Sequence, residues 1–264
     1  SRDKEPLGTD ARGLKPDSRV RLRRRKSPPS DAVLSAIMIE NFKSFARAKL
    51  PLSELTVLIG ANASGKSNAL EALQLLSWLA RGQGLAQLRF DVKDRKLGLR
   101  GRIADLFRIG SESKTFGLGC SLAPDASGYS LVLSIKLAWD GERLRIVHEE
   151  LNCPEEKGSF PLYRVTEPAR MNGREMLVAY NNFAKGGKKP QITCVDEIPV
   201  FSQLVSPARF SESNRRSQKV IPRATSRVSE ALSNVLFLDP DPRSMRGYAN
   251  KADTTLGGDG TNLS

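Results

Sequence analysis

The chain has 264 residues, 39% of them hydrophobic, and a formal net charge of +13 from 42 Lys and Arg against 29 Asp and Glu. This is enough apolar material for one large or two small domains, but no apolar run approaches the roughly 20 residues of a membrane-spanning helix. The three cysteines are widely spaced, which excludes a disulfide framework or a zinc site and fits a reducing cytoplasm. We therefore expect a cytoplasmic protein without a membrane partner.

The first thirty residues differ in composition from the rest of the chain. They contain ten Lys and Arg, four Asp and Glu and four prolines, with almost no periodic apolar pattern. Such a segment cannot bury enough surface to offset the entropy of ordering it, so residues 1–31 are predicted to be a disordered basic tail. Its run Arg19–Lys26 could hold nucleic acid by charge alone, and a solvated tail or a translated leader would explain it equally well.

Ordered structure is expected to begin near Ala32 with strands. Ala36–Glu40 has the composition of a first strand, and Ala46–Leu50 that of a second, which runs toward Pro51. The apolar, β-branched run Leu55–Ile59 is predicted to be a third, buried strand.

Residues 60–67 have the sequence Gly-Ala-Asn-Ala-Ser-Gly-Lys-Ser, a complete G-x-x-x-x-G-K-[ST] phosphate-binding loop. The segment 67–79 that follows contains no Gly or Pro and is rich in Leu and Ala, so a strand, a glycine-rich loop and a helix are predicted in the order that the motif requires. A chance match in a Gly/Ser-rich turn is the alternative. The motif predicts that this chain binds a nucleoside triphosphate, with ATP as the expected ligand.

The residue types of the loop explain this chemistry. Gly60 and Gly65 let the backbone approach a polyphosphate closely, and the helix that begins near Lys66 adds the positive end of its dipole. The Lys66 ammonium can reach the β- and γ-phosphates, and the Ser67 hydroxyl can ligate Mg²⁺. The expected nucleotide-binding residues of the loop are Gly60, Ala61, Asn62, Ala63, Ser64, Gly65, Lys66 and Ser67.

The elements expected after the loop are a helix, an irregular stretch and a β-rich section. The helix should place Ala69, Leu70, Leu73, Leu76 and Ala80 in the core and end at Gly82 and Gly84. Residues 85–115 are basic and irregular, with a short helix at 103–107. The predicted strands of the β-rich section are Phe116–Leu122, Tyr129–Ala138, Arg143–Asn152, Leu162–Val165 and Glu175–Tyr180, with a hairpin turn at Asp140-Gly141. The lone histidine, His148, lies in one of these strands and is expected to be structural or exposed.

The last part of the sequence turns helical from Ile198, with a second helix over Thr225–Asn234 and a buried strand at Val235–Leu238. It also contains a cluster of six cations, opposed nearby only by Glu212. A solvated helix face and a surface that follows DNA phosphates are both compatible with this cluster. Its members are Arg209, Arg215, Arg216, Lys219, Arg223 and Arg227.

Three segments together resemble one family. Ile37–Phe45, which ends in Phe-Lys-Ser-Phe, then Leu55–Asn68, and then Leu70–Leu73 are similar to the opening of ABC-type ATPase heads of the RecF, SMC and overcoming-lysogenization-defect group, the bacterial AAA-family ATP-binding proteins. The resemblance is specific over residues 36–80, and weaker similarities occur at 237–248 and 259–263. It implies an α/β P-loop NTPase fold, a head-like lobe with a mixed sheet and an antiparallel β section, over residues 32–264.

The resemblance also adds residues to the nucleotide site. Asn68, which follows the loop serine, matches the family, and Lys43 would reach the nucleotide because the Phe-Lys-Ser loop of relatives lies beside it. A solvated charge at a strand end is an equally good account of Lys43. Glu71 is expected to be structural.

Hydrolysis in that family needs a Ser-Gly-Gly signature, supplied by a second head, and an apolar strand that ends in Asp-Glu. This chain has no credible signature. Ile192–Glu197 and Val235–Asp239 imitate the strand, but the first is short and the second is followed by Pro240, so we interpret both as chance matches. We expect the N-terminal half of a longer ATPase, truncated before its helical lobe and catalytic acids, and assign no catalytic residue.

The resemblance implies ATP and Mg²⁺ as cofactors and nucleotide-driven pairing, either as a homodimer of heads or with a second ATPase half. DNA repair, chromosome maintenance or phage defence would be the setting, with DNA contacts through Arg19–Lys26 and Arg209–Arg227. The alternative from a different class is a non-enzymatic nucleic-acid-binding protein in which the phosphate loop is vestigial.

Overall fold

The structure is a computed structural model that describes residues 32–93, 97–155, 160–170 and 172–237. The predicted tail 1–31, the end of the predicted strand at Leu238 and the family similarities beyond it lie outside these residues.

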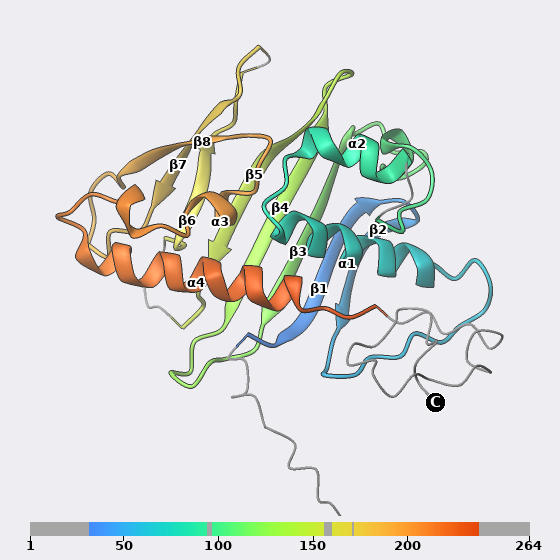
Figure 1. The fold of residues 1–264 in the computed structure, drawn as a ribbon, viewed down its shortest axis with the longest axis horizontal. Coiled ribbons are helices and arrows are strands. Elements are labelled where there is room, and N and C mark those ends of the chain that lie inside the picture. The colour runs from blue at the N-terminus through green and yellow to red at the C-terminus, as the bar shows by residue number, and fades with distance from the viewer. Residues whose placement is uncertain (1–31, 94–96, 156–159, 171, 238–264) are drawn as a thin grey trace, which may run out of the picture. The chain divides into compact units, whose positions relative to one another are not determined.

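The described strands form a single eight-stranded sheet in the order β2-β1-β3-β4-β5-β6-β7-β8, shown in Figure 1. Every pair of neighbouring strands is antiparallel. Only the first two places depart from the order of the sequence, because β1 lies between β2 and β3. The strands are β1 (Leu34–Phe42), β2 (Phe45–Pro51), β3 (Thr115–Leu122), β4 (Leu131–Trp139), β5 (Leu144–Asn152), β6 (Tyr163–Glu167), β7 (Glu175–Tyr180) and β8 (Gln191–Val195).

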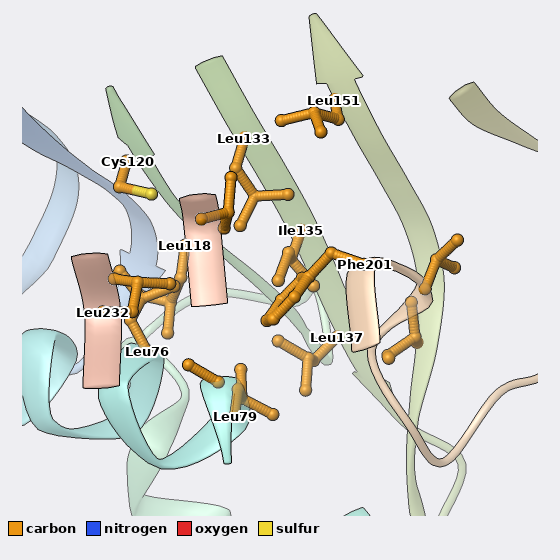
Figure 2. Close-up of a cluster of buried hydrophobic side chains, with 14 of the residues drawn as sticks. Leu76, Leu79, Leu118, Cys120, Leu133, Ile135, Leu137, Leu151, Phe201 and Leu232 are labelled. Atoms are coloured by element: carbon orange, nitrogen blue, oxygen red, sulfur yellow. The ribbon is translucent and has the colours of Figure 1, made fainter. Parts of the chain in front are cut away.

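The helices lie over one face of this sheet (Figure 1), and the core fills the space between the two layers. They are α1 (Lys66–Ala80), α2 (Leu85–Lys93), α3 (Val200–Gln203) and α4 (Arg215–Ser233), with 3-10 turns η1 (Ile103–Leu106) and η2 (Pro207–Arg209). Figure 2 shows the centre of the core, where side chains of α1 meet those of the sheet and of α3 and α4. The residues labelled there are Leu76, Leu79, Leu118, Cys120, Leu133, Ile135, Leu137, Leu151, Phe201 and Leu232.

The structure confirms the hairpin predicted from the alternating apolar residues of 129–138, which is formed by β4 and β5. In β4 the buried residues are Leu131, Leu133, Ile135 and Leu137, which places one side of the strand in the core. The turn between β4 and β5 contains Asp140 and Gly141 as predicted. The Asp140 carboxylate accepts hydrogen bonds from the backbone N–H groups of residues 142 and 143, and Gly141 has a φ of 107°, a conformation that favours glycine.

The helices agree less closely with the prediction from the sequence than the strands do. The prediction missed α2, whose basic surface obscures the buried Leu85, Leu88 and Val92. It began the last helix at Thr225, whereas α4 begins ten residues earlier and includes Pro222, a residue that normally ends a helical pattern.

The predicted third strand, Leu55–Ile59, is wrong. This segment has no regular secondary structure and pairs with none of the described strands. Its apolar side chains face solvent, with exposed fractions of 76% for Leu55, 69% for Val57 and 90% for Ile59. A strand needs a hydrogen-bonding partner, and the described residues offer none here, so the parallel component expected for the sheet is not formed by them. The described part of the predicted strand at Val235, residues 235–237, is likewise not a strand.

Candidate nucleotide-binding site

The phosphate-binding loop leads directly into α1, which confirms the loop–helix part of the prediction. Gly65 precedes the helix in a left-handed conformation, with a φ of 94°, and α1 has no side-chain cap and no acidic residue in its first turn. The first N–H groups of a helix need partners from outside it, and the helix dipole favours an anion there. The start of α1 is thus suited to a phosphate group, which is the fit that the motif requires.

Lys66 is folded back over its own loop. Its ammonium donates hydrogen bonds to the carbonyl oxygens of Gly60 at 2.6 Å and Ala61 at 2.7 Å, with the Ser64 hydroxyl 3.5 Å away. The loop residues 60–64 are exposed, so the charge lies at an open surface. This places one positive charge at the mouth of the loop, beside the uncapped end of α1.

The turn between β1 and β2 packs against the loop. The Asn68 amide donates to the Ser44 hydroxyl at 2.8 Å, which joins the turn to the first turn of α1. A Cβ atom at Gly65 would lie 3.3 Å from the Phe45 ring and 3.4 Å from the Ser44 hydroxyl. Position 65 therefore favours glycine because of its positive φ, and a side chain there would also have to displace the Phe45 ring or the Ser44 hydroxyl slightly.

Lys43 is not a solvated charge, because its ammonium has partners in α1 and in the Arg100 segment. Its ammonium pairs with the Glu71 carboxylate, donates to the Arg100 carbonyl at 2.9 Å, and its side chain is only 10% exposed. Glu71 is 2% exposed and also accepts the Arg100 Nε at 2.7 Å, so it holds cations from two distant segments. Glu71 therefore has the structural role that was expected. Its carboxylate holds the β1–β2 turn, through Lys43, and the Arg100 segment against α1.

Arg100 is the residue that the sequence interpretation missed. Its guanidinium, with a side chain that is 67% exposed, lies 3.5 Å from the Asn68 side-chain oxygen. It also lines an open hollow of about 1150 Å³ together with Arg89, Lys93, Arg102 and Trp139. The flanking Gly98 and Gly101, both with positive φ, were the available signal for a sharply turned loop here.

The Asp-Glu pair at the end of β8 lies away from this site. Asp196 is buried against the Arg143 guanidinium at 2.8 Å, and Glu197 pairs with Arg174 at 3.1 Å. The Glu197 carbonyl accepts the N–H of Leu85, a residue that follows the C-terminal end of α1. A 15-residue helix is about 22 Å long, so these carboxylates are near the end of α1 opposite the loop. This geometry agrees with a chance match.

The remaining reactive side chains belong to the core or the sheet. Burial raises the pKa of the Cys120 thiol to about 12 and that of Cys194 to about 11, so neither forms a thiolate near neutral pH. His148 is half-buried in β5, and burial lowers its pKa. Across the described ranges, no group of His, Cys, Asp and Glu could hold a metal ion. Nor does any described helix have the length and apolar character to span a membrane.

The six-cation cluster is divided by the fold. Arg209 donates to the Thr193 carbonyl on the edge strand β8, and the buried Arg227 bonds the carbonyls of residues 123 and 129 and pairs with Asp125 at 3.2 Å. These two cations are structural, which corrects the prediction of one continuous DNA surface over Arg209–Arg227. The sequence could not distinguish them because their partners lie far away in the chain.

Together, the sheet, the helical layer and the phosphate loop at the start of α1 define an α/β lobe of the P-loop ATPase class. The chain belongs to the AAA ATPase domain family, whose sequence profile matches residues 33–223. It is 44% identical over 70 residues to the DNA replication and repair protein RecF of Gloeobacter violaceus, a match that covers 26% of this chain and 17% of that protein. The family match confirms the resemblance to the AAA-family ATPases, and a RecF protein is among the relatives, as the resemblance implied.

A similarity to a solved structure, an SMC head bound to the C-terminal winged-helix domain of ScpA, covers 45% of this chain and 35% of the head. The sequence identity is 22% and the TM-score is 0.33. The chain thus matches much less than two thirds of either relative's length.

Proposed function

We propose that the chain binds Mg-ATP at residues 60–68 and acts as part of an ATPase head of the RecF, SMC and OLD type. The observation that carries this proposal is the uncapped, Gly65-led start of α1 with the Lys66 ammonium over the loop. Backbone N–H groups and Lys66 would hold the phosphates, and Ser67 would hold Mg²⁺. When bound, Mg²⁺ neutralises charge on the β- and γ-phosphate oxygens.

Arg100 adds a second positive charge to this arrangement. It is anchored through its Nε to the buried Glu71, which leaves the rest of the exposed guanidinium beside Asn68. Glu71 and Lys43 would then position the β1–β2 turn and Arg100 around the first turn of α1, where the nucleotide binds. We assign Lys43 a positioning role in place of the expected direct contact.

Calorimetric titration with ATP in the presence and absence of Mg²⁺ tests this proposal. Wild-type protein should bind ATP more tightly with Mg²⁺. Ser67→Ala removes the hydroxyl that would ligate the ion, so this difference should shrink several-fold while metal-free ATP binding persists. Ser53→Ala, which changes an exposed serine outside the loop, serves as the control and should keep the full Mg²⁺ effect. An unchanged Mg²⁺ effect in Ser67→Ala would contradict the assignment.

We also propose that the head pairs with a second copy or with a second ATPase half. The support is the exposed apolar run 55–59, because clustered apolar side chains of this kind on a protein surface mark an interaction site. This run ends where the phosphate loop begins, so a partner that covers it would be linked directly to the state of the loop.

Light scattering in saturating Mg-ATP tests the pairing. For self-association, the measured mass should rise toward two chains, and Val57→Lys with Ile59→Lys should prevent the rise because two charges would be buried in an apolar contact. A mass that stays at one chain would contradict self-association and leave a separate second half as the partner.

A DNA-linked role, in repair, chromosome maintenance or phage defence, is the proposed setting, supported by the identity with a replication and repair protein. The alternative, a nucleic-acid-binding protein with a vestigial loop, is favoured by one observation. Exposed cations on α4, among them Arg215, Lys219 and Arg223, could contact nucleic-acid phosphates whether or not the loop holds a nucleotide. Nucleic-acid binding that does not depend on Mg-ATP, in a protein without nucleotide affinity, would favour this alternative.

A further inference from the structure

Cations gather on the outer face of the N-terminal half of α4. The helix is strongly amphipathic: Ser217, Ile221, Ala224 and Val228 are buried against the core, whereas the basic residues of its N-terminal half are exposed. Two further exposed lysines lie in the loop between β7 and β8. We call these residues the basic α4 surface, which consists of Lys185, Lys188, Arg215, Arg216, Lys219 and Arg223.

Specific contacts hold the β7–β8 loop beside α4. The buried Ser217 hydroxyl donates to the Asn181 carbonyl at 2.8 Å, and the Arg216 guanidinium stacks 4.2 Å above the Phe183 ring. Lys189 closes the loop by donating to the Asn182 side-chain oxygen at 3.2 Å and to a loop carbonyl. The lysines at positions 185 and 188 are therefore carried on a loop that is fixed to the first turns of the helix.

This surface is separate from the candidate nucleotide site. Helices α1 and α4 meet near their C-terminal ends, where the Ser229 hydroxyl of α4 donates to the Ala80 carbonyl of α1 at 2.9 Å. The phosphate loop lies at the N-terminal end of α1, and the basic residues lie on the N-terminal half of α4. Ligands at the two places would not compete for the same side chains.

The spacing of the cations suits a linear polyanion. Arg215, Lys219 and Arg223 recur every four residues and so follow one side of the helix over about 12 Å. Duplex DNA carries one charge per about 1.7 Å of axis when both strands are counted, so a length of about 12 Å carries about seven phosphate charges, and the helix can contact those on the side that faces it. The Arg223 guanidinium has Asp125 at 3.8 Å, but that carboxylate is shared with the buried Arg227, which approaches it more closely.

We propose that the basic α4 surface binds the phosphate backbone of double-stranded DNA, independently of sequence and of bound nucleotide. This inference deepens the proposed DNA-linked role and rests on it. It replaces Arg209 and Arg227 of the predicted cluster, which are structural, with Lys185 and Lys188 from a different element. The chemistry is that of Lys and Arg side chains contacting phosphate oxygens, which positions a duplex but does not select its bases.

The test compares two proteins that lose the same number of charges from the full chain. One carries Lys185→Gln, Lys188→Gln, Arg215→Gln and Lys219→Gln. The matched control carries Lys49→Gln, Arg81→Gln, Arg108→Gln and Lys114→Gln, which are exposed elsewhere. Affinity for a duplex of random sequence is measured by fluorescence anisotropy from 0.05 to 0.3 M salt, and thermal melting checks that both proteins are folded.

The surface variant should bind at least about tenfold more weakly at 0.1 M salt, and its slope of log K against log salt should be shallower by about three to four units. The control should stay close to wild type. Equal losses in the two variants, no loss in the surface variant, or no duplex binding by the wild type would overturn the proposal. Deleting residues 1–31 should lower all affinities alike and leave the difference between the two variants intact; loss of that difference would also overturn it.

Nucleotide measurements separate this proposal from the proposed ATP site. The surface variant should bind Mg-ATP as the wild type does, while Lys66→Ala should bind Mg-ATP about 10- to 150-fold more weakly and keep its duplex affinity. Failure of the DNA proposal therefore appears in the anisotropy series alone, and failure of the ATP proposal in the titration alone.

Discussion

Lys66→Ala is expected to weaken binding of Mg-ATP by about 10- to 150-fold. The Lys66 ammonium lies over the phosphate loop, bonded to carbonyl oxygens of Gly60 and Ala61, where it can pair with phosphate oxygens. A hydrogen bond to a charged group contributes about 1.5–3 kcal/mol, which corresponds to this range of affinity. Isothermal titration calorimetry measures the change directly.

Lys49→Ala is the matched control for this substitution. Lys49 is exposed on β2, so its removal deletes the same charge without touching the loop. The control should bind Mg-ATP like the wild type, which would show that the effect of Lys66 is local and does not come from net charge. Equal affinities of wild type and Lys66→Ala would contradict the proposed site.

Glu149→Ala is expected to lower the free energy of unfolding by about 3–5 kcal/mol. The Glu149 carboxylate is completely buried and accepts hydrogen bonds from the N–H groups of Val200 and Phe201 and from the Tyr163 hydroxyl, at 2.7–2.8 Å. It therefore ties the start of α3 to β5 and β6. Removal leaves three buried donors without an acceptor, and each costs about 1–3 kcal/mol. Urea unfolding at pH 7.5 provides the measurement.

The neighbouring Glu150 offers a matched control. It is on the opposite side of β5, where it pairs with Arg164 on a partly exposed surface. Glu150→Ala should cost no more than about 1 kcal/mol, as exposed ion pairs usually do. Similar losses in the two variants would show that the buried network around Glu149 is not what fixes α3.

The same carboxylate gives a pH dependence with a definite sign. Burial raises the pKa of Glu149 from 4.5 to about 7, so the folded state holds this proton more tightly than the unfolded chain does. Its contribution to stability is therefore present below about pH 4.5 and is lost as the pH rises to about 7. Glu149→Gln cannot titrate and should flatten this part of the stability curve.

Local patterns predicted much of the fold because they record burial directly. The alternation in β4 and the Asp140-Gly141 turn located the central hairpin, and the Leu- and Ala-rich segment after the loop located α1. The prediction of a strand at Leu55–Ile59 was wrong because a strand also needs a neighbouring strand to pair with. Its residues have the intrinsic preference for a strand, but pairing depends on a partner, and the described residues supply none.

The candidate site was predicted only where it is continuous in sequence. The motif identified residues 60–67, whereas the contacts of Lys43 and Arg100 with Glu71 join segments 28 and 29 residues apart. The spacing of apolar residues along the sequence cannot reveal contacts between residues so far apart. The same limit explains Arg209 and Arg227, whose carbonyl partners at Thr193 and on the β3–β4 connection make them structural.

Hydrogen exchange with and without Mg-ATP tests the central claim, nucleotide binding at the phosphate loop, most directly. If the phosphates are held by the loop and the first turn of α1, Mg-ATP should slow exchange of the amides of residues 60–69 in the wild type and leave those of β6–β8 unchanged. Lys66→Ala should show much less of this protection at the same nucleotide concentration. Protection elsewhere without any at residues 60–69, or no protection at saturating Mg-ATP, would contradict the account.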